Sequence, residues 1–329
     1  MKRGFLLGKF MPPHAGHMLL CDAARRLVDE LTILVCWLPD DPIAGSKRLE
    51  WMRELQPDCR VIGHDAIVPQ RPEDDPAFWD IWRRIVREAH PQPVDFLFAG
   101  EGYGARLAEE VGAEFVPLGA RCMGVDTGGI GGVSATAIRA DPWGCWRWLP
   151  APVRAHYART ICLHGPESVG KSAVAERLAE HFGTISVPEY GRAYCAAHGT
   201  DLGEAELAHI AEVQQALRDA SFGACERRLF LDTDPLMTAA WSEMMLGRSA
   251  PRLLQYPKAD LYLMLDPDVP WTDDGTRLFG DADQRARFAG LCRSVLEAAG
   301  VRWVSVSGGW EERFRACIAS VEALPPPSA

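Results

Sequence analysis

A lysine and a serine that follow a glycine mark the first candidate site for chemistry. Lys171 and Ser172 come directly after Gly170, and four residues separate Gly170 from Gly165, which gives the pattern G-x-x-x-x-G-K-S. Glycines at these places let the backbone approach a polyphosphate closely, so that several N–H groups can donate hydrogen bonds to it. Lys171 would reach the outer phosphates, and the Ser172 hydroxyl would ligate Mg²⁺. The spacing therefore predicts a nucleotide-binding phosphate loop.

Two histidines near the start of the chain mark a second candidate phosphate site. His14 and His17 flank Gly16 within the run G-K-F-M-P-P-H-A-G-H over residues 8–17. Their ring nitrogens can donate hydrogen bonds to phosphate oxygens. A single histidine is more often structural, but two histidines on either side of a glycine favour a phosphate site. The residues predicted to bind phosphate here are Gly8, Lys9, Phe10, His14, Gly16 and His17.

Carboxylates follow two apolar runs in the second half of the chain. Glu189 comes after the strand-like residues 184–188, and Asp232 after residues 228–231. A carboxylate in this position beside a phosphate loop can accept a proton from an acceptor hydroxyl or hold Mg²⁺. We favour Glu189 as the general base and Asp232 as the metal ligand. The residues alone leave the reverse assignment open.

Alternating strands and helices must position these groups. An apolar strand precedes each phosphate motif and a helical pattern follows it, which indicates parallel sheets with ligands at the C-terminal ends of the strands. A chain of 329 residues is also long for one core. We predict an α/β fold with two domains, residues 1–141 and 159–329. The aromatic segment 142–158 joins them, and we expect it to pack between them.

The histidine run resembles the signature of the nucleotidylyltransferase superfamily. In that family an S-x-T-x-x-R run opens a helix that holds the ATP phosphates, and Ser134, Thr136 and Arg139 match it. A simple helix cap is the plainer interpretation of Ser134. Trp79 and Trp82, three residues apart, would share one helix face. Core packing is the plainer interpretation of either tryptophan, and stacking on a flat heterocycle is the alternative.

Together with E-Y-G-R, D-T-D and W-x-D-D-G-x-R, these motifs resemble the bifunctional nicotinamide-nucleotide adenylyltransferase and ribosylnicotinamide kinase family, the NadR type. The resemblance implies a Rossmann-like N-terminal nucleotidylyltransferase sheet and a C-terminal P-loop kinase sheet. The kinase would phosphorylate nicotinamide riboside with ATP and Mg²⁺, and the other domain would convert nicotinamide mononucleotide and ATP to NAD. The family assigns catalysis to His14, His17, Arg139, Lys171, Glu189 and Asp232.

The resemblance also implies contacts with substrate and with ATP. The expected substrate-binding residues are Trp79, Glu101, Tyr103, Tyr190, Arg192, Asp234, Trp271, Asp273 and Asp274. Glu167 and Arg277 are expected near the ATP phosphates, Arg277 on a polar segment that would close as a lid. Thr272 and Thr276 stand where the family has apolar side chains. From the residues alone, Asp273 and Asp274 fit a simple turn as well, and Arg277 a surface ion pair.

Composition limits the remaining function classes. The formal charge of −10 disfavours non-specific nucleic-acid binding, and because the first catalytic strand begins by Gly4 we also expect no helix-turn-helix and no DNA binding. Ten scattered cysteines without a C-x-x-C pair indicate free thiols in a reducing cytoplasm, and no segment predicts a membrane span. A kinase and nucleotidylyltransferase for other small substrates, or a nucleotide-switched regulator or transport-coupled sensor, are the alternatives. The oligomeric state, homo-oligomers included, stays open.

Overall fold

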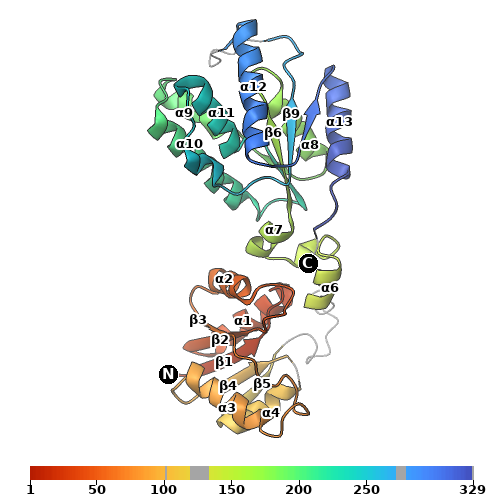
Figure 1. Cartoon of the computed structure of the whole chain (residues 1–329). Helices are drawn as coiled ribbons and strands as arrows, with labels where there is room; N and C mark the ends of the chain where they lie inside the picture. Colours follow the sequence, from red (N-terminus) through yellow and green to blue (C-terminus); the bar gives the residue numbers. More distant parts are fainter. Residues whose placement is uncertain (101, 119–132, 272–278, 328–329) are drawn as a thin grey trace. The chain divides into compact units, whose positions relative to one another are not determined.

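The computed structural model describes residues 1–100, 102–118, 133–271 and 279–327. Its internal contacts divide the chain between His156 and Tyr157 into two units, each of which is an α/β unit (Figure 1). Each unit contains one five-stranded parallel sheet, so the predicted α/β class with two parallel sheets is confirmed. In the described residues no helix is both long and apolar enough to cross a membrane.

The first unit is built on a sheet with the strand order β3-β2-β1-β4-β5. Strand β1 lies at its centre and pairs with both β2 and β4, so that Leu6 is level with Ile33 and with Phe98. The strands are β1 (Arg3–Gly8), β2 (Glu30–Cys36), β3 (Arg60–His64), β4 (Phe96–Ala99) and β5 (Glu114–Pro117). The helices are α1 (Ala15–Leu27), α2 (Gly45–Leu55), α3 (Phe78–Ala89), α4 (Tyr103–Val111) and α6 (Ala135–Ala140).

The segment 142–158 contains two short helices instead of an extended linker. They are the 3₁₀ helix η2 (Trp146–Trp148) and α7 (Ala151–Tyr157). Trp146 is buried, and the Arg154 guanidinium lies 5.6 Å from the centre of its ring. The division between the two units falls inside this segment.

The second unit is built on a sheet with the strand order β10-β9-β6-β8-β7. Strand β6 is central and β7 is an edge strand, paired with β8. The strands are β6 (Arg159–His164), β7 (Ile185–Val187), β8 (Arg228–Leu231), β9 (Leu261–Leu265) and β10 (Trp303–Val306). The helices are α8 (Lys171–His181), α9 (Tyr190–His198), α10 (Glu204–Ser221), α11 (Pro235–Leu246), η3 (Pro251–Leu254), α12 (Ala282–Ala298) and α13 (Trp310–Glu322).

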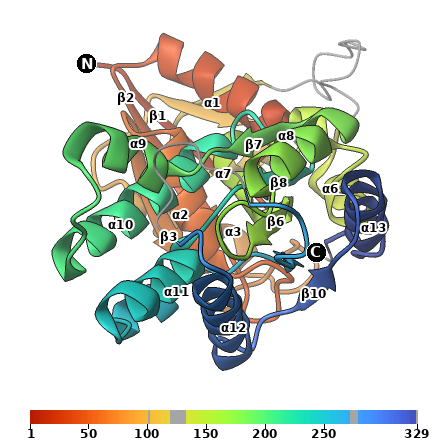
Figure 2. The ribbon, with the colours of Figure 1, turned by 90° about the horizontal axis from the view of Figure 1, so that it is seen from above.

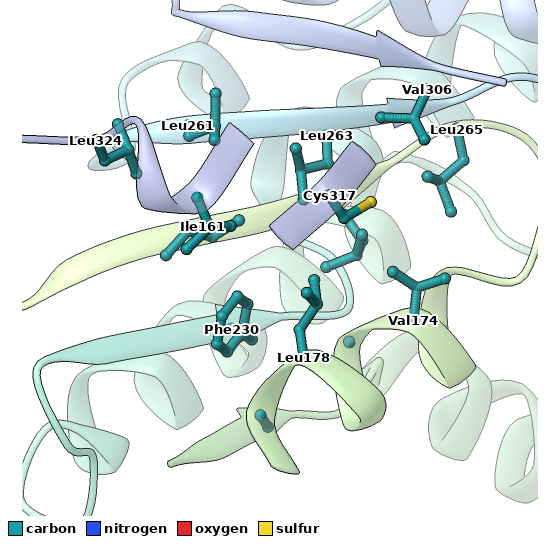
Figure 3. Packing of buried hydrophobic residues seen from close by; sticks show 14 of the residues in the cluster. Ile161, Val174, Leu178, Phe230, Leu261, Leu263, Leu265, Val306, Cys317 and Leu324 are labelled. Atoms are coloured by element: carbon teal, nitrogen blue, oxygen red, sulfur yellow. The ribbon is translucent and has the colours of Figure 1, made fainter. Parts of the chain in front are cut away.

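Within the second unit, buried strands and helices fix the position of the phosphate loop. Ile161 and Leu263 from the central strands pack with Leu178 of α8 and Cys317 of α13 in one apolar cluster (Figure 3). Helices α9 and α10 lie on one side of this unit and α13 on the other (Figure 2). The central strands β6, β8 and β9 are largely apolar and buried, as is typical of a sheet covered on both faces.

Candidate active sites

The loop between β6 and α8 has the backbone shape that the glycine pattern predicts. Gly165 has φ 129° and Gly170 has φ 89°, both in the region that favours glycine. A Cβ at Gly165 would lie 2.6 Å from the Leu265 carbonyl oxygen, and one at Gly170 would lie 2.4 Å from the Trp310 ring. Both positions therefore require glycine for two reasons, backbone conformation and space.

The side chain of Lys171 reaches back to the loop that precedes α8. Its Nζ donates to the carbonyl oxygens of Gly165 at 3.0 Å and Pro166 at 2.9 Å. Lys171 and Ser172 are also the first two residues of α8, whose N-terminal end carries a partial positive charge. The loop thus combines an ammonium group, a helix N-terminus and a glycine-rich backbone, which together suit a polyphosphate.

Ser172 and Asp232 form a pair that suits a magnesium ion. The Ser172 hydroxyl donates to Asp232 Oδ2 at 2.6 Å, and Asp232 follows β8 with only 4% of its surface exposed. Its other oxygen, Oδ1, is buried and has no hydrogen-bond partner among the described residues. Hydroxyl and carboxylate oxygens are ligands that Mg²⁺ prefers, with its remaining ligands supplied by water and phosphate. The described residues hold no group of three or more His, Cys, Asp or Glu side chains that would make an all-protein metal cage.

Glu189 lies in the wall of a cavity of about 260 Å³ beside the phosphate loop. Its side chain is 18% exposed, and Arg192 Nη2 lies 3.6 Å from its Oε2. Burial raises the pKa of the Glu189 carboxyl above its ordinary value; the Asp232 carboxylate raises it further, whereas Lys171 and Arg192 lower it. A half-buried carboxylate with a raised pKa in such a cavity suits proton transfer.

Several residues of this cavity wall were not predicted from the sequence. Thr238 and Trp241 come from α11, an apolar helix whose pattern gives no sign of a ligand site. Gln214 could have been recognised from the sequence, because it lies on the same buried face of α10 as Leu207 and Ile210. A polar side chain on the buried face of an amphipathic helix is the signal that could have singled it out. Further lining residues are Cys195, Thr200 and Leu202.

Two residues expected to bind substrate have other positions. Asp234 caps α11, where its Oδ1 accepts from Leu236 N and Met237 N while Tyr262 donates to Oδ2, and it is 2% exposed. Both of its oxygens are engaged in the fold, and it is absent from the cavity wall. The ring of Tyr190 packs against Tyr194 and His209 and likewise does not line the cavity. These contacts give Asp234 and Tyr190 structural roles and do not support the substrate contacts we expected.

The other residues predicted to bind substrate or ATP in the second unit lie in or near the segment 272–278, or contact a residue next to it. Asp273, Asp274 and Arg277, like Glu101 in the first unit, lie outside the described residues. Trp271 is described and is not part of the cavity wall. Glu167 lines the cavity, and its Oε2 accepts a hydrogen bond from Phe279 N at 2.9 Å. The phosphate loop is thereby bonded to the residue that directly follows this segment.

The histidine run of the first unit forms a compact group at the start of α1. His14 is the N-cap of this helix, and its Nδ1 accepts from Gly16 N at 3.1 Å. The neutral His14 ring therefore carries its proton on Nε2, as a donor. The ring centres of His14 and His17 are 3.9 Å apart, and the buried Phe10 ring lies 5.0 Å from His17. The two imidazoles are thus positioned together, as their spacing predicts.

A buried ion-pair network supports the residues just before the histidines. Arg48 is fully buried, and it donates from Nη1 to the Lys9 carbonyl at 2.6 Å and from Nη2 to Asp41 Oδ2 at 2.7 Å. Lys9 Nζ in turn donates to Asp41 Oδ1 at 3.1 Å. Burial alone would raise the pKa of Asp41, but hydrogen bonds from Leu38 N, Arg48 and Lys9 outweigh it and lower the pKa. Asp41 and Arg48 were not predicted from the sequence.

The run at residues 134–139 meets the histidine run across a long sequence separation. Arg139 Nη1 donates to the Met11 carbonyl at 2.5 Å, and its Nη2 donates to Thr136 Oγ1 at 3.3 Å. Ser134 caps α6 by accepting from Ala137 N at 3.1 Å, so its plainer interpretation holds in the structure. These contacts join two motifs that are 128 residues apart.

Both runs line one cavity of about 550 Å³ in the first unit. Trp79, Trp82 and Tyr103 line it as well. Trp82 is 8% exposed and its Nε1 donates to the Pro69 carbonyl, whereas Trp79 is only partly buried. The predicted phosphate-side residues on the wall are Gly8, Lys9, Phe10, His14, Gly16, His17, Ser134, Thr136 and Arg139.

Known proteins are similar to this chain over most of its length or over a part of it. Residues 160–313 match the family model described as "AAA domain". The Escherichia coli (strain K12) "Trifunctional NAD biosynthesis/regulator protein NadR" is 29% identical over 349 residues, covering 98% of this chain and 83% of that protein. The "Nicotinamide-nucleotide adenylyltransferase" of Pyrobaculum neutrophilum is 27% identical over 120 residues, which is 35% of this chain and 65% of that protein.

A solved structure shares the fold. The crystal structure of NadR protein in complex with NR matches with a TM-score of 0.74 and 20% identity, and it covers all of this chain and 98% of the other. At 20% identity this match shows that the two chains share a fold. The sequence similarity to the Escherichia coli protein spans both candidate sites of this chain.

Proposed function

We propose that this chain, a protein of the NadR type, is a bifunctional enzyme of NAD salvage. Its second unit transfers a phosphoryl group from ATP to nicotinamide riboside, and its first unit transfers an adenylyl group from ATP to nicotinamide mononucleotide, giving NAD and pyrophosphate. The observation that carries the proposal is the presence of two phosphate sites, each with its own cavity, in two separate α/β units.

In the kinase reaction a ribose hydroxyl oxygen attacks the γ-phosphorus of ATP, and the bond to the leaving ADP breaks. The attacking hydroxyl loses a proton, and Glu189 suits this proton because its carboxylate lines the cavity while Asp232 lies deeper, bonded to Ser172. Lys171 offers positive charge to the transferred phosphoryl group. This contrast between the two carboxylates supports Glu189 as the base and Asp232 as the metal ligand.

Ser172 and Asp232 are the residues that would hold Mg²⁺ in this unit. The buried Asp232 Oδ1, which has no partner in the described part of the chain, supports this assignment. When bound, the ion supplies positive charge to the oxygens of the β- and γ-phosphates.

Adenylyl transfer in the first unit has different requirements. The phosphate of the mononucleotide is already a charged nucleophile, and it attacks the α-phosphorus of ATP as pyrophosphate leaves. No proton has to be removed from it, so positioning and charge neutralisation suffice. His14 and His17 donate from their rings, while Lys9 and Arg139 bring positive charge to the same cavity.

The proposal is tested by incubating the purified protein with nicotinamide riboside, ATP and Mg²⁺. Mass spectrometry should detect nicotinamide mononucleotide first and NAD afterwards, with ADP and pyrophosphate as the second products. Absence of both the mononucleotide and NAD would reject the kinase activity. Failure to convert supplied mononucleotide to NAD would reject the adenylyltransferase activity.

A further inference from the structure

The turn that carries Glu189 is held on both sides by a single side chain from another helix. Gln214 of α10 accepts from Tyr190 N at 2.8 Å through its Oε1 and donates from its Nε2 to the Pro188 carbonyl at 3.1 Å. Only one orientation of the amide satisfies an N–H donor and a carbonyl acceptor together. Gln214 is 2% exposed and also lines the cavity.

The Glu189 carboxylate lines the cavity, has Arg192 as its ion-pair partner and is not used to cap its own helix. Glu189 is the N-cap residue of α9, a position whose side chain usually accepts from the first N–H groups of its own helix, yet it makes no such bond. The N–H of Tyr190, the first residue of α9, also lacks a partner within the helix, and Gln214 accepts from it. Gln214 thus supplies a side-chain acceptor at this helix N-terminus, where Glu189 supplies none.

The other contacts of this turn are the pairing of β7 with β8, the ring contacts of Tyr190 and the ion pair of Arg192 with Glu189. Helix α9 has no buried side chain, and the preceding strand β7 is three residues long and lies at the edge of the sheet. Strong packing therefore does not define the direction of the Glu189 side chain. The two hydrogen bonds of Gln214, made in a buried place, act on the backbone immediately before and after it.

We propose that Gln214 is a positioning residue for riboside phosphorylation, which keeps the Glu189 carboxylate directed into the cavity by bonding the backbone on both sides of it. This inference rests on the kinase function proposed above. Gln214 acts through Glu189, and its own amide takes no part in proton or phosphoryl transfer.

The first test replaces Gln214 with methionine, which has a similar length but cannot form either bond. Since small displacements of a catalytic group have large effects, kcat for riboside phosphorylation should fall about 10- to 100-fold. The KM for ATP should stay within about twofold, because Lys171 and Ser172 are unchanged. The matched control is Gln215→Met on the same helix, where the amide donates from Nε2 to Asp219 Oδ1 and the residue lies outside the cavity wall. The control should keep kcat.

A double variant separates positioning from a general structural role. If Gln214 acts through Glu189, adding Gln214→Met to Glu189→Gln should lower kcat by less than about twofold more. A merely structural residue would lower kcat by the same factor in both backgrounds. Equal factors in the two backgrounds would therefore overturn the inference.

Three outcomes separate this inference from the proposed function. A wild-type protein without riboside phosphorylation contradicts the proposed function itself. An active wild type with equal kcat in Gln214→Met and Gln215→Met contradicts the role of Gln214 alone. A Gln214→Met variant that does not bind a non-hydrolysable ATP analogue is misfolded and cannot test the role of Gln214. In that case Gln214→Glu is measured instead, because glutamate keeps the acceptor for Tyr190 N and loses the donor for the Pro188 carbonyl. Its kcat should be several-fold below wild type, and a wild-type value would overturn the inference.

Discussion

The two loops proposed to bind phosphate would offer an anion different chemical groups but have similar structural support. The loop at residues 165–172 would offer backbone N–H groups, a helix N-terminus and one lysine, whereas the run at residues 8–17 would offer the side chains of Lys9, His14 and His17. Each loop nevertheless depends on a fully buried arginine from a distant helix. Arg48 donates to the Lys9 carbonyl, and Arg313 donates to the Val169 carbonyl at 3.0 Å.

The difference between the two arginines lies in their counter-charges. Asp41, which faces Arg48, is only 9% exposed and also bonds Lys9, so the supporting arginine and the lysine proposed to bind an anion form one network. Asp268, which faces Arg313, is 41% exposed, and Arg313 donates mainly to carbonyl oxygens, including those of Asp266 and Gly308. The run at residues 8–17 is therefore linked to Arg48 through the charge of Asp41. The loop at residues 165–172 is bonded to Arg313 mostly through neutral backbone groups.

The largest expected effect separates the two reactions by their need for a base. Glu189→Gln should lower kcat for riboside phosphorylation about 10²–10⁴-fold, because a general base is lost while size and one acceptor remain. Adenylylation of supplied mononucleotide should be unchanged. Steady-state kinetics of both reactions checks this. A near-normal kcat with a raised riboside KM would assign Glu189 to ribose binding and leave Asp232 as the base.

How much of these sites could be predicted depended on whether the residues are close in sequence. The glycine-rich loop was recognisable because Gly165, Gly170, Lys171 and Ser172 are contiguous and their conformational requirements are local. The fold class followed from the alternation of strands and helices. Asp232 was recognisable for a related reason, since it directly follows an apolar strand.

Support residues from remote helices could not be predicted in the same way. Arg48, Gln214 and Arg313 each bond a backbone carbonyl or N–H that is 24 to 144 residues away, and no local pattern specifies such a partner. Asp234 had a second interpretation that is local in sequence. It stands in a motif expected to bind substrate, but an aspartate before a proline-started helix is also a strong N-cap, and the structure contains that cap.

The second prediction tests whether the two loops work independently. Lys171→Ala should lower riboside phosphorylation about 10²–10³-fold while conversion of mononucleotide to NAD survives, because one positively charged donor is lost from one site. His17→Ala should have the reverse pattern. Product analysis by mass with each substrate supplied separately measures both activities. Loss of both activities in either folded variant would contradict two separate sites.

The third prediction concerns pH. Because burial raises the pKa of Glu189, the acid side of the kcat profile for riboside phosphorylation should lie at higher pH than for an ordinary glutamate. Below that pKa the base is protonated, so the rate should fall about tenfold per pH unit. Adenylylation by the same protein is the internal control, since it shares the titration of ATP and lacks the base. Identical acid limbs for the two reactions would argue against Glu189 as a titrating base.

The smallest expected effect, in stability, tests the contrast between the two buried arginines directly. Arg48→Met leaves Asp41 without its main partner in a nearly buried place, so removing that charge as well, in Arg48→Met/Asp41→Asn, should recover stability. We expect a coupling energy of about 1–3 kcal/mol in this double-mutant cycle. Arg313→Met with Asp268→Asn should show less than about 1 kcal/mol, because water solvates the exposed Asp268 once its partner is gone.

Hydrogen exchange read by mass spectrometry measures both cycles in the intact chain, because peptides from residues 1–156 and 157–327 report on each unit separately. The single variants should raise exchange mainly in the unit that contains the substitution. Equal coupling energies in the two cycles would mean that Asp268 is as important to its arginine as Asp41 is. The Arg48–Asp41 and Arg313–Asp268 pairs would then contribute equally to stability, and the difference in exposure between the two aspartates would have no energetic consequence.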